Sequence, residues 1–168
     1  MAISCRKDAH VPSPGKFSAI INGVNTEFTI KTAALVRSTL TNEKRIDIGG
    51  VSQDGKYVLV LSVIEDNAAG DIIASKNYPV RLFNNDDPDT DMDESVNTNA
   101  FVSLGIYTNN QLQTDIYIEN GHISVTDTNE SRLSVSGNFS IRMKSRSNSE
   151  SFIITDGVFK RVKYTVIN

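Results

Sequence analysis

The residues best suited to chemistry form an acidic stretch, NNDDPDTDMDES, from Asn84 to Ser95. Carboxylate oxygens are the ligands that calcium prefers in proteins. Four aspartates alternate with other residues along the stretch, and they could turn their carboxylates inward if the segment curled: Asp87, Asp89, Asp91 and Asp93. They are the candidate metal site, and calcium is the one cofactor that the sequence suggests.

The spacing within this stretch does not match a calcium-binding EF-hand. An EF-hand loop that began at Asp87 would need glycine at its sixth position and glutamate at its twelfth. Met92 and Thr98 occupy those positions. A run of like charges that contains a proline, here Pro88, is typical of a solvated, extended loop. We favour the solvated loop and keep a calcium-dependent binding module as an alternative.

No set of residues in the sequence makes a convincing catalytic centre. Serine hydrolysis needs a base beside the nucleophile, but neither His10 nor His122 lies near a Gly-x-Ser-x-Gly motif, which the chain lacks. Asp115 and Glu119 share one face of an expected strand, where four residues at about 3.3 Å each separate them by about 13 Å. Glycosidases place two carboxyl groups roughly 5 to 9.5 Å apart. We therefore predict that the protein is not an enzyme, and glycosidase is the enzyme class left open.

The remaining polar residues do not identify a partner. Carboxyl groups from different strands could converge, for example Asp47 and Glu65, but charges that protect strand edges and ends look the same in a sequence. Serine- and threonine-rich strand faces, with Arg142, Lys144 and Arg146 beside them, are compatible with weak contact to a glycan or a protein. The predicted partner is therefore an unknown protein or glycan.

The single cysteine, Cys5, is the candidate site of lipid attachment. Ser4 precedes it and a polar stretch with two prolines follows, as at the end of a bacterial lipoprotein signal. Residues 1–16 would then be a tether, and the protein would contact the membrane only through the lipid on Cys5. This hypothesis predicts a cell-envelope location, periplasmic or anchored to the outer membrane. The alternative is a native start at Met1 with an ordinary reduced thiol.

Length and composition limit the class of protein. A chain of 168 residues is long enough for one domain with a substantial core, and we assign residues 17–168 to it. The formal charge of −3 and the lack of a dense basic window argue against nucleic acid. Apolar runs stay well short of the roughly 20 residues that cross a bilayer as a helix.

Alternation of apolar and polar residues predicts an all-β domain. In LSVSGNFSIRM, apolar side chains from Leu133 to Met143 fall on one face and polar side chains on the other. In KYVLVLSVIE both faces are apolar, which predicts a central strand, and TAALVRSTL is assigned to a strand in preference to a short helix. About ten such strands predict an antiparallel β-sandwich or a partly closed β-barrel, and strand counting does not separate the two.

Four dipeptides predict tight turns between consecutive strands: Asn22-Gly23, Asp54-Gly55, Asn120-Gly121 and Asp156-Gly157. If the sheet closes, a second function becomes possible, because a barrel can carry a small apolar ligand. That alternative predicts a cavity lined by Leu59, Leu61, Phe139 and Ile141.

Short motifs spread along the chain carry a family resemblance. FSAIINGVNTEF, ENGHISVTDT, SVSGNFSIRM and FIITDGVFKRVKY resemble the landmarks of a family of small, uncharacterised all-β lipoproteins of Bacteroidota, and the match runs from Phe17 to Tyr164. The chain departs from that pattern in lacking a tryptophan after the first Asn-Gly pair and in its acidic run from Asp86 to Glu94. The resemblance implies an anchored envelope protein and no particular activity.

The same motifs have structural interpretations. Gly23 and Gly157 suit turns, whereas Gly137 within a strand predicts a bulge or the close approach of another backbone. Three phenylalanines within the motifs are the expected core anchors: Phe17, Phe139 and Phe159.

Overall fold

Alternating side chains do form strands along almost the whole described chain. The computed structural model describes residues 15–80, 100–109, 111–113, 116–146 and 150–168, which contain eleven strands and no helix. The strands are β1 (Lys16–Ile21), β2 (Val24–Ser38), β3 (Glu43–Ser52), β4 (Tyr57–Glu65), β5 (Asn77–Val80), β6 (Ala100–Thr108), β7 (Gln111–Gln113), β8 (Ile116–Asn129), β9 (Ser134–Ser145), β10 (Ser151–Lys163) and β11 (Thr165–Ile167). The all-β prediction is confirmed.

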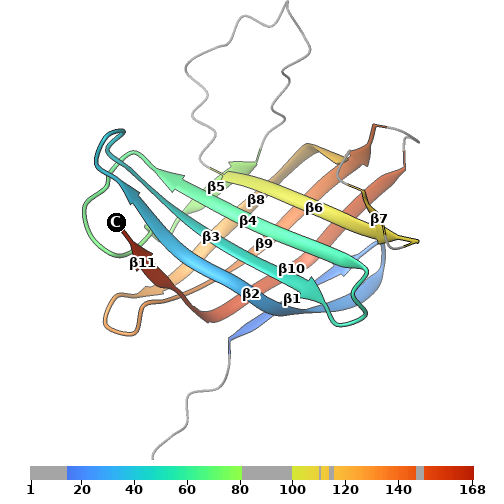
Figure 1. The fold of residues 1–168 in the computed structure, drawn as a ribbon, viewed down its shortest axis with the longest axis horizontal. Coiled ribbons are helices and arrows are strands. Elements are labelled where there is room, and N and C mark those ends of the chain that lie inside the picture. Colours follow the sequence, from blue (N-terminus) through green and yellow to red (C-terminus); the bar gives the residue numbers. More distant parts are fainter. Residues whose placement is uncertain (1–14, 81–99, 110, 114–115, 147–149) are drawn as a thin grey trace, which may run out of the picture.

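Nine of these strands close into a barrel (Figure 1). Around its wall they follow the order β1, β10, β9, β8, β5, β6, β4, β3 and β2, and β2 pairs with β1 again. The barrel alternative is therefore confirmed, and the sandwich alternative is wrong. Two strands lie outside the closed path, since β7 pairs with β6 and β11 pairs with β2. All pairings are antiparallel except β5 with β6 and β11 with β2.

The barrel interior is filled by one face of each strand. Along β4 every second residue from Tyr57 to Glu65 is buried, while the residues between them are half-buried. β4 pairs with β3 on one side and with β6 on the other, so the predicted central position is confirmed. Its outward residues are only half-buried because the barrel wall is a single layer. The strand prediction for TAALVRSTL is confirmed as far as Ser38, since it forms the second half of β2.

Aromatic rings and glycines fit together on the inner face. Phe17, Phe139 and Phe159 are all buried, as predicted, and the rings of Phe17 and Phe139 lie 5.9 Å apart. Across the β9–β10 pair Gly157 faces Phe139 and Gly137 faces Phe159. A methyl group at Gly157 would meet the Phe139 ring at about 2.5 Å, and one at Gly137 would collide with the Phe159 ring and with Ser124 O. The prediction for Gly137 is confirmed.

Two of the four expected turns are turns, and two are bulges within strands. Asn22-Gly23 joins β1 to β2 with φ of 49° and 80°, and Asp54-Gly55 lies between β3 and β4 with Gly55 at φ 73°. Asn120-Gly121 and Asp156-Gly157 instead lie inside β8 and β10, beside shifts of register. The turn predictions there were wrong: the positive φ of Asp156 serves a bulge in place of a turn, and neither Asn120 nor Gly121 has a positive φ.

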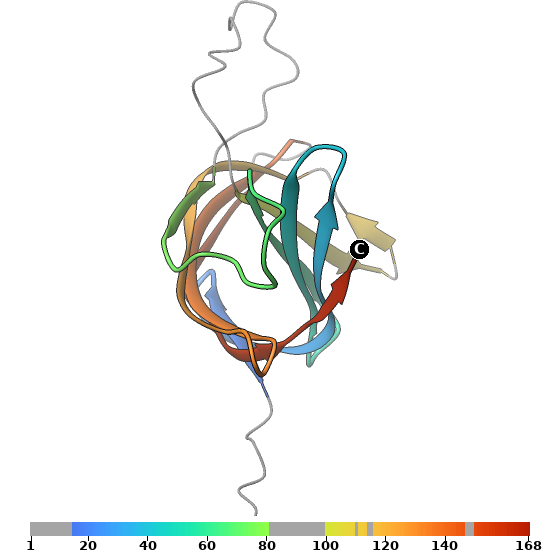
Figure 2. The same ribbon diagram turned by 90° about the vertical axis from the view of Figure 1, so that its left-hand side faces the viewer.

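A segment between β4 and β5 crosses one end of the barrel, as Figure 2 shows. We call residues 66–76 the plug segment. After it, β5 occupies only Asn77–Val80. Ile73 of the plug segment is fully buried, and Tyr164 donates a hydrogen bond to Asp71 O at 2.6 Å. Arg37 Nη1 lies 2.9 Å from Asp71 Oδ1, so the two side chains form an ion pair. Asp71 Oδ1 accepts no hydrogen bond.

Candidate functional site

Seven of the residues singled out in the sequence lie outside the described residues. These are Cys5, His10, Asp115 and the four aspartates Asp87, Asp89, Asp91 and Asp93. The lipid site and the calcium site therefore stay predictions. Glu119 and His122 are half-buried on β8, where His122 pairs with Pro79 of β5 and does not follow a turn.

The described residues contain no group of three or more histidine, cysteine, aspartate or glutamate side chains placed to hold a metal ion. They also form no helix that is long and apolar enough to cross a membrane.

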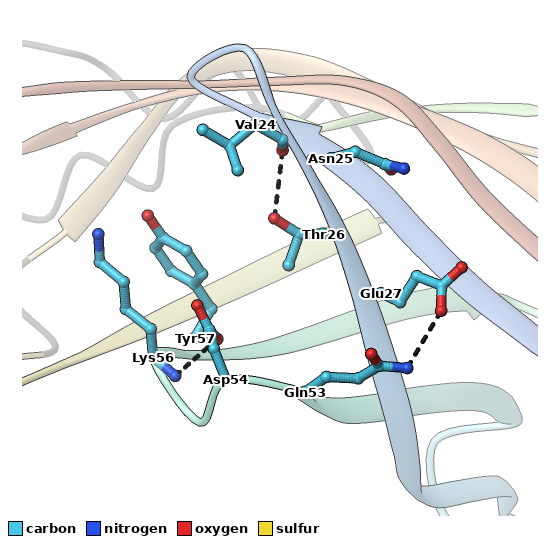
Figure 3. A pocket seen from close by; sticks show the side chains of 8 residues that line it. All are labelled: Val24, Asn25, Thr26, Glu27, Gln53, Asp54, Lys56 and Tyr57. Atoms are coloured by element: carbon cyan, nitrogen blue, oxygen red, sulfur yellow. Dashed lines mark hydrogen bonds between the residues drawn. The ribbon is translucent and has the colours of Figure 1, made fainter.

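A polar pocket of about 260 Å³ lies between two hairpins at the barrel end opposite the plug segment (Figure 3). We call it the hairpin pocket. Its walls are Val24, Asn25, Thr26 and Glu27 at the start of β2, with Gln53, Asp54, Lys56 and Tyr57 around the turn from β3 to β4. The two walls meet because β2 pairs with β3, with Phe28 opposite Ser52.

Hydrogen bonds between the two hairpins hold several pocket residues in place. Gln53 Nε2 donates to Glu27 Oε2 at 3.1 Å, and the Gln53 backbone N–H donates to Glu27 O at 3.0 Å. Ser52 Oγ donates to Asp54 Oδ1 at 2.5 Å and accepts from the Tyr57 N–H at 2.8 Å. Side chains fixed in this way lose less entropy when a ligand binds.

The charges of the pocket are mixed. The hydrogen bonds from Ser52 and from the Lys56 backbone N–H hold the pKa of Asp54 below its ordinary value, so this carboxylate is an acceptor at neutral pH. Lys56 Nζ lies 5.1 Å from the centre of the Tyr57 ring, within cation–π range. Val24 adds an apolar contact, because 65% of its surface is exposed.

A second polar cluster lies at the plugged end of the barrel and contains a buried ion pair. Lys44 at the start of β3 and Glu65 at the end of β4 are only 6% and 8% exposed, and Lys44 Nζ lies 3.3 Å from Glu65 Oε2. Lys44 also donates to Ala69 O at 2.8 Å, and Glu65 Oε1 accepts from the Ala74 N–H at 3.0 Å. Both charged groups thus bind the plug segment.

Tyr78 completes this cluster. Its hydroxyl lies 2.6 Å from Glu65 Oε1 and 2.8 Å from Ala74 O, so its one proton can be donated to either oxygen. Burial raises the pKa of Tyr78 far above its ordinary value, and the hydrogen bond and charge of Glu65 add to the shift. Burial by itself would raise the Glu65 pKa, but the hydrogen bonds from Tyr78, Ala74 and Lys44 outweigh it and the net pKa is lowered.

We interpret this second cluster as a structural latch for the plug segment. A pocket of about 430 Å³ lies beside it, and three of the charged residues on its wall, Lys44, Glu65 and Lys76, already form ion pairs with one another. The sequence left open whether Glu65 is a charge at a strand end. Glu65 is the last residue of β4, and its side chain lies on the buried face of that strand.

The class of protein defined by these features is a single closed β-barrel with a plugged end and a polar pocket at the other end. The chain belongs to the family described as "Domain of unknown function (DUF6252)", which matches residues 32–163. No curated protein and no solved structure shows a significant match. Membership agrees with the expected uncharacterised family, whereas the lipoprotein and Bacteroidota parts of the resemblance stay predictions.

Proposed function

We propose that the protein is a non-catalytic binding module of the cell envelope that recognises a glycan through the hairpin pocket. The observation that carries this proposal is the pocket itself, in which amide and carboxylate side chains from two hairpins line one cavity together with Tyr57. Closed barrels provide a rigid wall, and functional residues are often found on the connections of such scaffolds.

The side chains of the pocket suit the hydroxyl groups of a sugar. A hydroxyl both donates and accepts, and the amides of Asn25 and Gln53 can do the same, while Glu27 and Asp54 accept. The exposed Val24 can contact the apolar side of a sugar ring. The volume of about 260 Å³ lies near the lower end of ligand pockets, which favours one terminal sugar over a long chain segment.

A glycan array probed with the labelled, unlipidated chain tests this proposal, followed by calorimetry on any glycan that binds. We expect Gln53→Ala and Asn25→Ala each to weaken binding by about tenfold, since each removes a polar contact to a bound hydroxyl. Asn138→Ala on β9 is the matched control because Asn138 is also exposed and is not part of the pocket. Glycan binding that neither pocket variant weakens would contradict the assignment, as would an array without any hit.

The envelope part of the proposal rests on Cys5. Metabolic labelling of the full-length gene product with a radioactive fatty acid should mark the wild type and leave Cys5→Ser unlabelled, because the thiol is the attachment point. A labelled Cys5→Ser variant, or an intact unprocessed N-terminus in the wild type, would contradict the anchor. The location would then be periplasmic or outer-membrane-anchored only if another signal provided it.

The apolar-carrier alternative is not proposed. The four residues expected to line its cavity, Leu59, Leu61, Phe139 and Ile141, are at most 2% exposed. None of them is on the wall of the four pockets of about 260, 250, 430 and 330 Å³. Their side chains pack against one another and their neighbours in the barrel core.

A further inference from the structure

Lysine and arginine side chains gather where the N-terminal residues join the barrel. Five of them form what we call the cationic face: Lys16 on β1, Lys31 on β2, and Lys160, Arg161 and Lys163 on β10. All five are exposed. The face is local, because the chain as a whole carries a formal charge of −3.

The backbone brings this face together at the start of β1. Lys16 is paired directly with Lys160 across the β1–β10 ladder, so two ammonium groups project from the same side of the wall. A methyl group at Gly15 would lie 3.1 Å from Arg161 O and 3.4 Å from Ile30 Cδ1, the residue that precedes Lys31. The chain therefore enters the barrel in the middle of the cationic face.

Like charges placed directly opposite each other destabilise a sheet, so an anion bound between Lys16 and Lys160 would relieve that cost. Within the part of the chain that the structure describes, the ion pairs of Arg37, Lys44, Arg45 and Lys76 do not involve the five cations of the face. A register shift between Phe159 and Val162 places Arg161 at φ 52°, and its N–H donates to Ser136 Oγ at 3.0 Å.

A shallow pocket of about 330 Å³ lies at one edge of this face. Lys160 and Arg161 line it together with the hydroxyl-bearing residues Thr126 and Ser136, and Asp127 is the acidic residue on its wall. Hydroxyl and cationic groups are the side chains that bind phosphate oxygens. An anionic group could therefore occupy this pocket as well as being attracted to the cationic face.

We propose that the cationic face docks the barrel against anionic phospholipid headgroups. This proposal rests on the proposed envelope location, because a lipid on Cys5 would hold the start of β1 near a membrane surface. Cations near such a surface attract anionic lipids within about one Debye length, and each contributes about fivefold to binding. The tether would supply the local concentration and the cationic face would set the orientation of the barrel.

Sedimentation of the full chain without its lipid tests the proposal, using vesicles of phosphatidylcholine alone and of an equal mixture with phosphatidylglycerol. We expect binding to the mixed vesicles only, weakened by added salt. Lys16→Gln/Lys160→Gln should reduce that binding by about 25-fold, the product of two fivefold contributions. The matched control is Arg45→Gln/Arg142→Gln, which removes the same charge from β3 and β9 and should leave binding unchanged.

Several results would overturn the proposal. Equal losses for the two double variants would show that net charge alone controls binding, and equal binding to both vesicles would exclude an electrostatic contact. Binding to soluble polyphosphate without binding to the mixed vesicles would assign the face to a soluble polyanion. Fatty-acid labelling of Cys5 reports separately on the anchor, so a failure of the docking face and a failure of the envelope assignment are distinguishable.

Discussion

Replacing Glu65 with glutamine is the sharpest test of the latch at the plugged end of the barrel. Glutamine keeps an oxygen that can accept from the Ala74 N–H and from Tyr78, but it removes the negative charge opposite Lys44. Lys44 would then be a buried ammonium group with one protein acceptor, Ala69 O. The variant therefore isolates the cost of an uncompensated charge.

The size of the effect follows from the burial of the pair. Removing one partner of a buried ion pair costs about 3 to 5 kcal/mol. Both side chains are at most 10% exposed, but Lys44 keeps its bond to Ala69 O, which favours the lower end of the range. For a chain of this size about 3 kcal/mol corresponds to a fall in melting temperature of about 6 to 12 °C.

Unfolding should be followed by circular dichroism in urea and on heating, since the chain has no tryptophan to report by fluorescence. The matched control is Glu27→Gln, an exposed carboxylate whose loss should cost less than about 1 kcal/mol. Lys44→Met/Glu65→Gln should recover part of the stability that Glu65→Gln loses, because the unpaired buried cation is gone.

The pH dependence gives an independent check. The folded-state pKa of Glu65 is lowered, so its contribution to stability is complete above the unfolded-state pKa of about 4.3 and is lost as the pH falls through the folded pKa. The difference in free energy of unfolding between the wild type and Glu65→Gln should therefore be constant near neutral pH and become smaller in acid. The latch would be refuted if Glu65→Gln lowered the free energy of unfolding by less than about 1 kcal/mol at pH 7. It would also be refuted if Lys44→Met/Glu65→Gln were less stable than Glu65→Gln.

Three further predictions concern the barrel and the acidic stretch. Gly157→Ala should lower the free energy of unfolding by about 1 to 3 kcal/mol in urea, because its methyl group would strike the Phe139 ring. Tyr78→Phe removes a hydrogen bond to Glu65 and should cost about 1 to 3 kcal/mol; it should also move acid unfolding to higher pH, and an unchanged acid midpoint would count against this. If the acidic stretch is a solvated loop, the melting temperature should be the same in millimolar calcium and in chelator, whereas a rise with calcium would support a site at Asp87 to Asp93.

Local sequence patterns predicted the strands well. They predicted the closure of the sheet into a barrel only as one of two alternatives. The alternation from Ser134 to Met143 is sufficient to place β9 and its buried face. Closure depends on β1, which pairs with β2 through the Asn22-Gly23 turn and with β10 from the far end of the chain. No short-range signal encodes that second pairing, because Lys16 and Lys160 meet only after the intervening sheet has curved round.

Glycine-containing dipeptides were interpreted correctly where the chain reverses and incorrectly where it bulges. Asn22 and Asp156 both have φ of 49°, and each is followed by a glycine. What distinguishes them is the partner strand: Gly157 lies opposite Phe139 of β9, so the chain continues in the same direction. That information lies in the tertiary pairing and is missing from the dipeptide.

The candidate sites were partly visible in the sequence. Both turns of the hairpin pocket were predicted, but their meeting requires the β2–β3 register. The latch was missed because Lys44, Glu65 and Tyr78 belong to three separate strands. One signal in the sequence could have found it. Glu65 lies on the same face of β4 as Leu59 and Leu61, which are buried. A charged residue at an inward position indicates a buried partner.

The closure of β1 by β10 also determines when this protein can fold. During synthesis the first hairpin leaves the ribosome long before Ser151–Lys163, so β1 and β9 each present an unsatisfied backbone edge until β10 arrives. Contacts between residues so distant in sequence make folding slow. Unpaired strand edges can also pair with other chains and cause aggregation. A chaperone that shields nascent chains should therefore raise the soluble yield more than a lower temperature does.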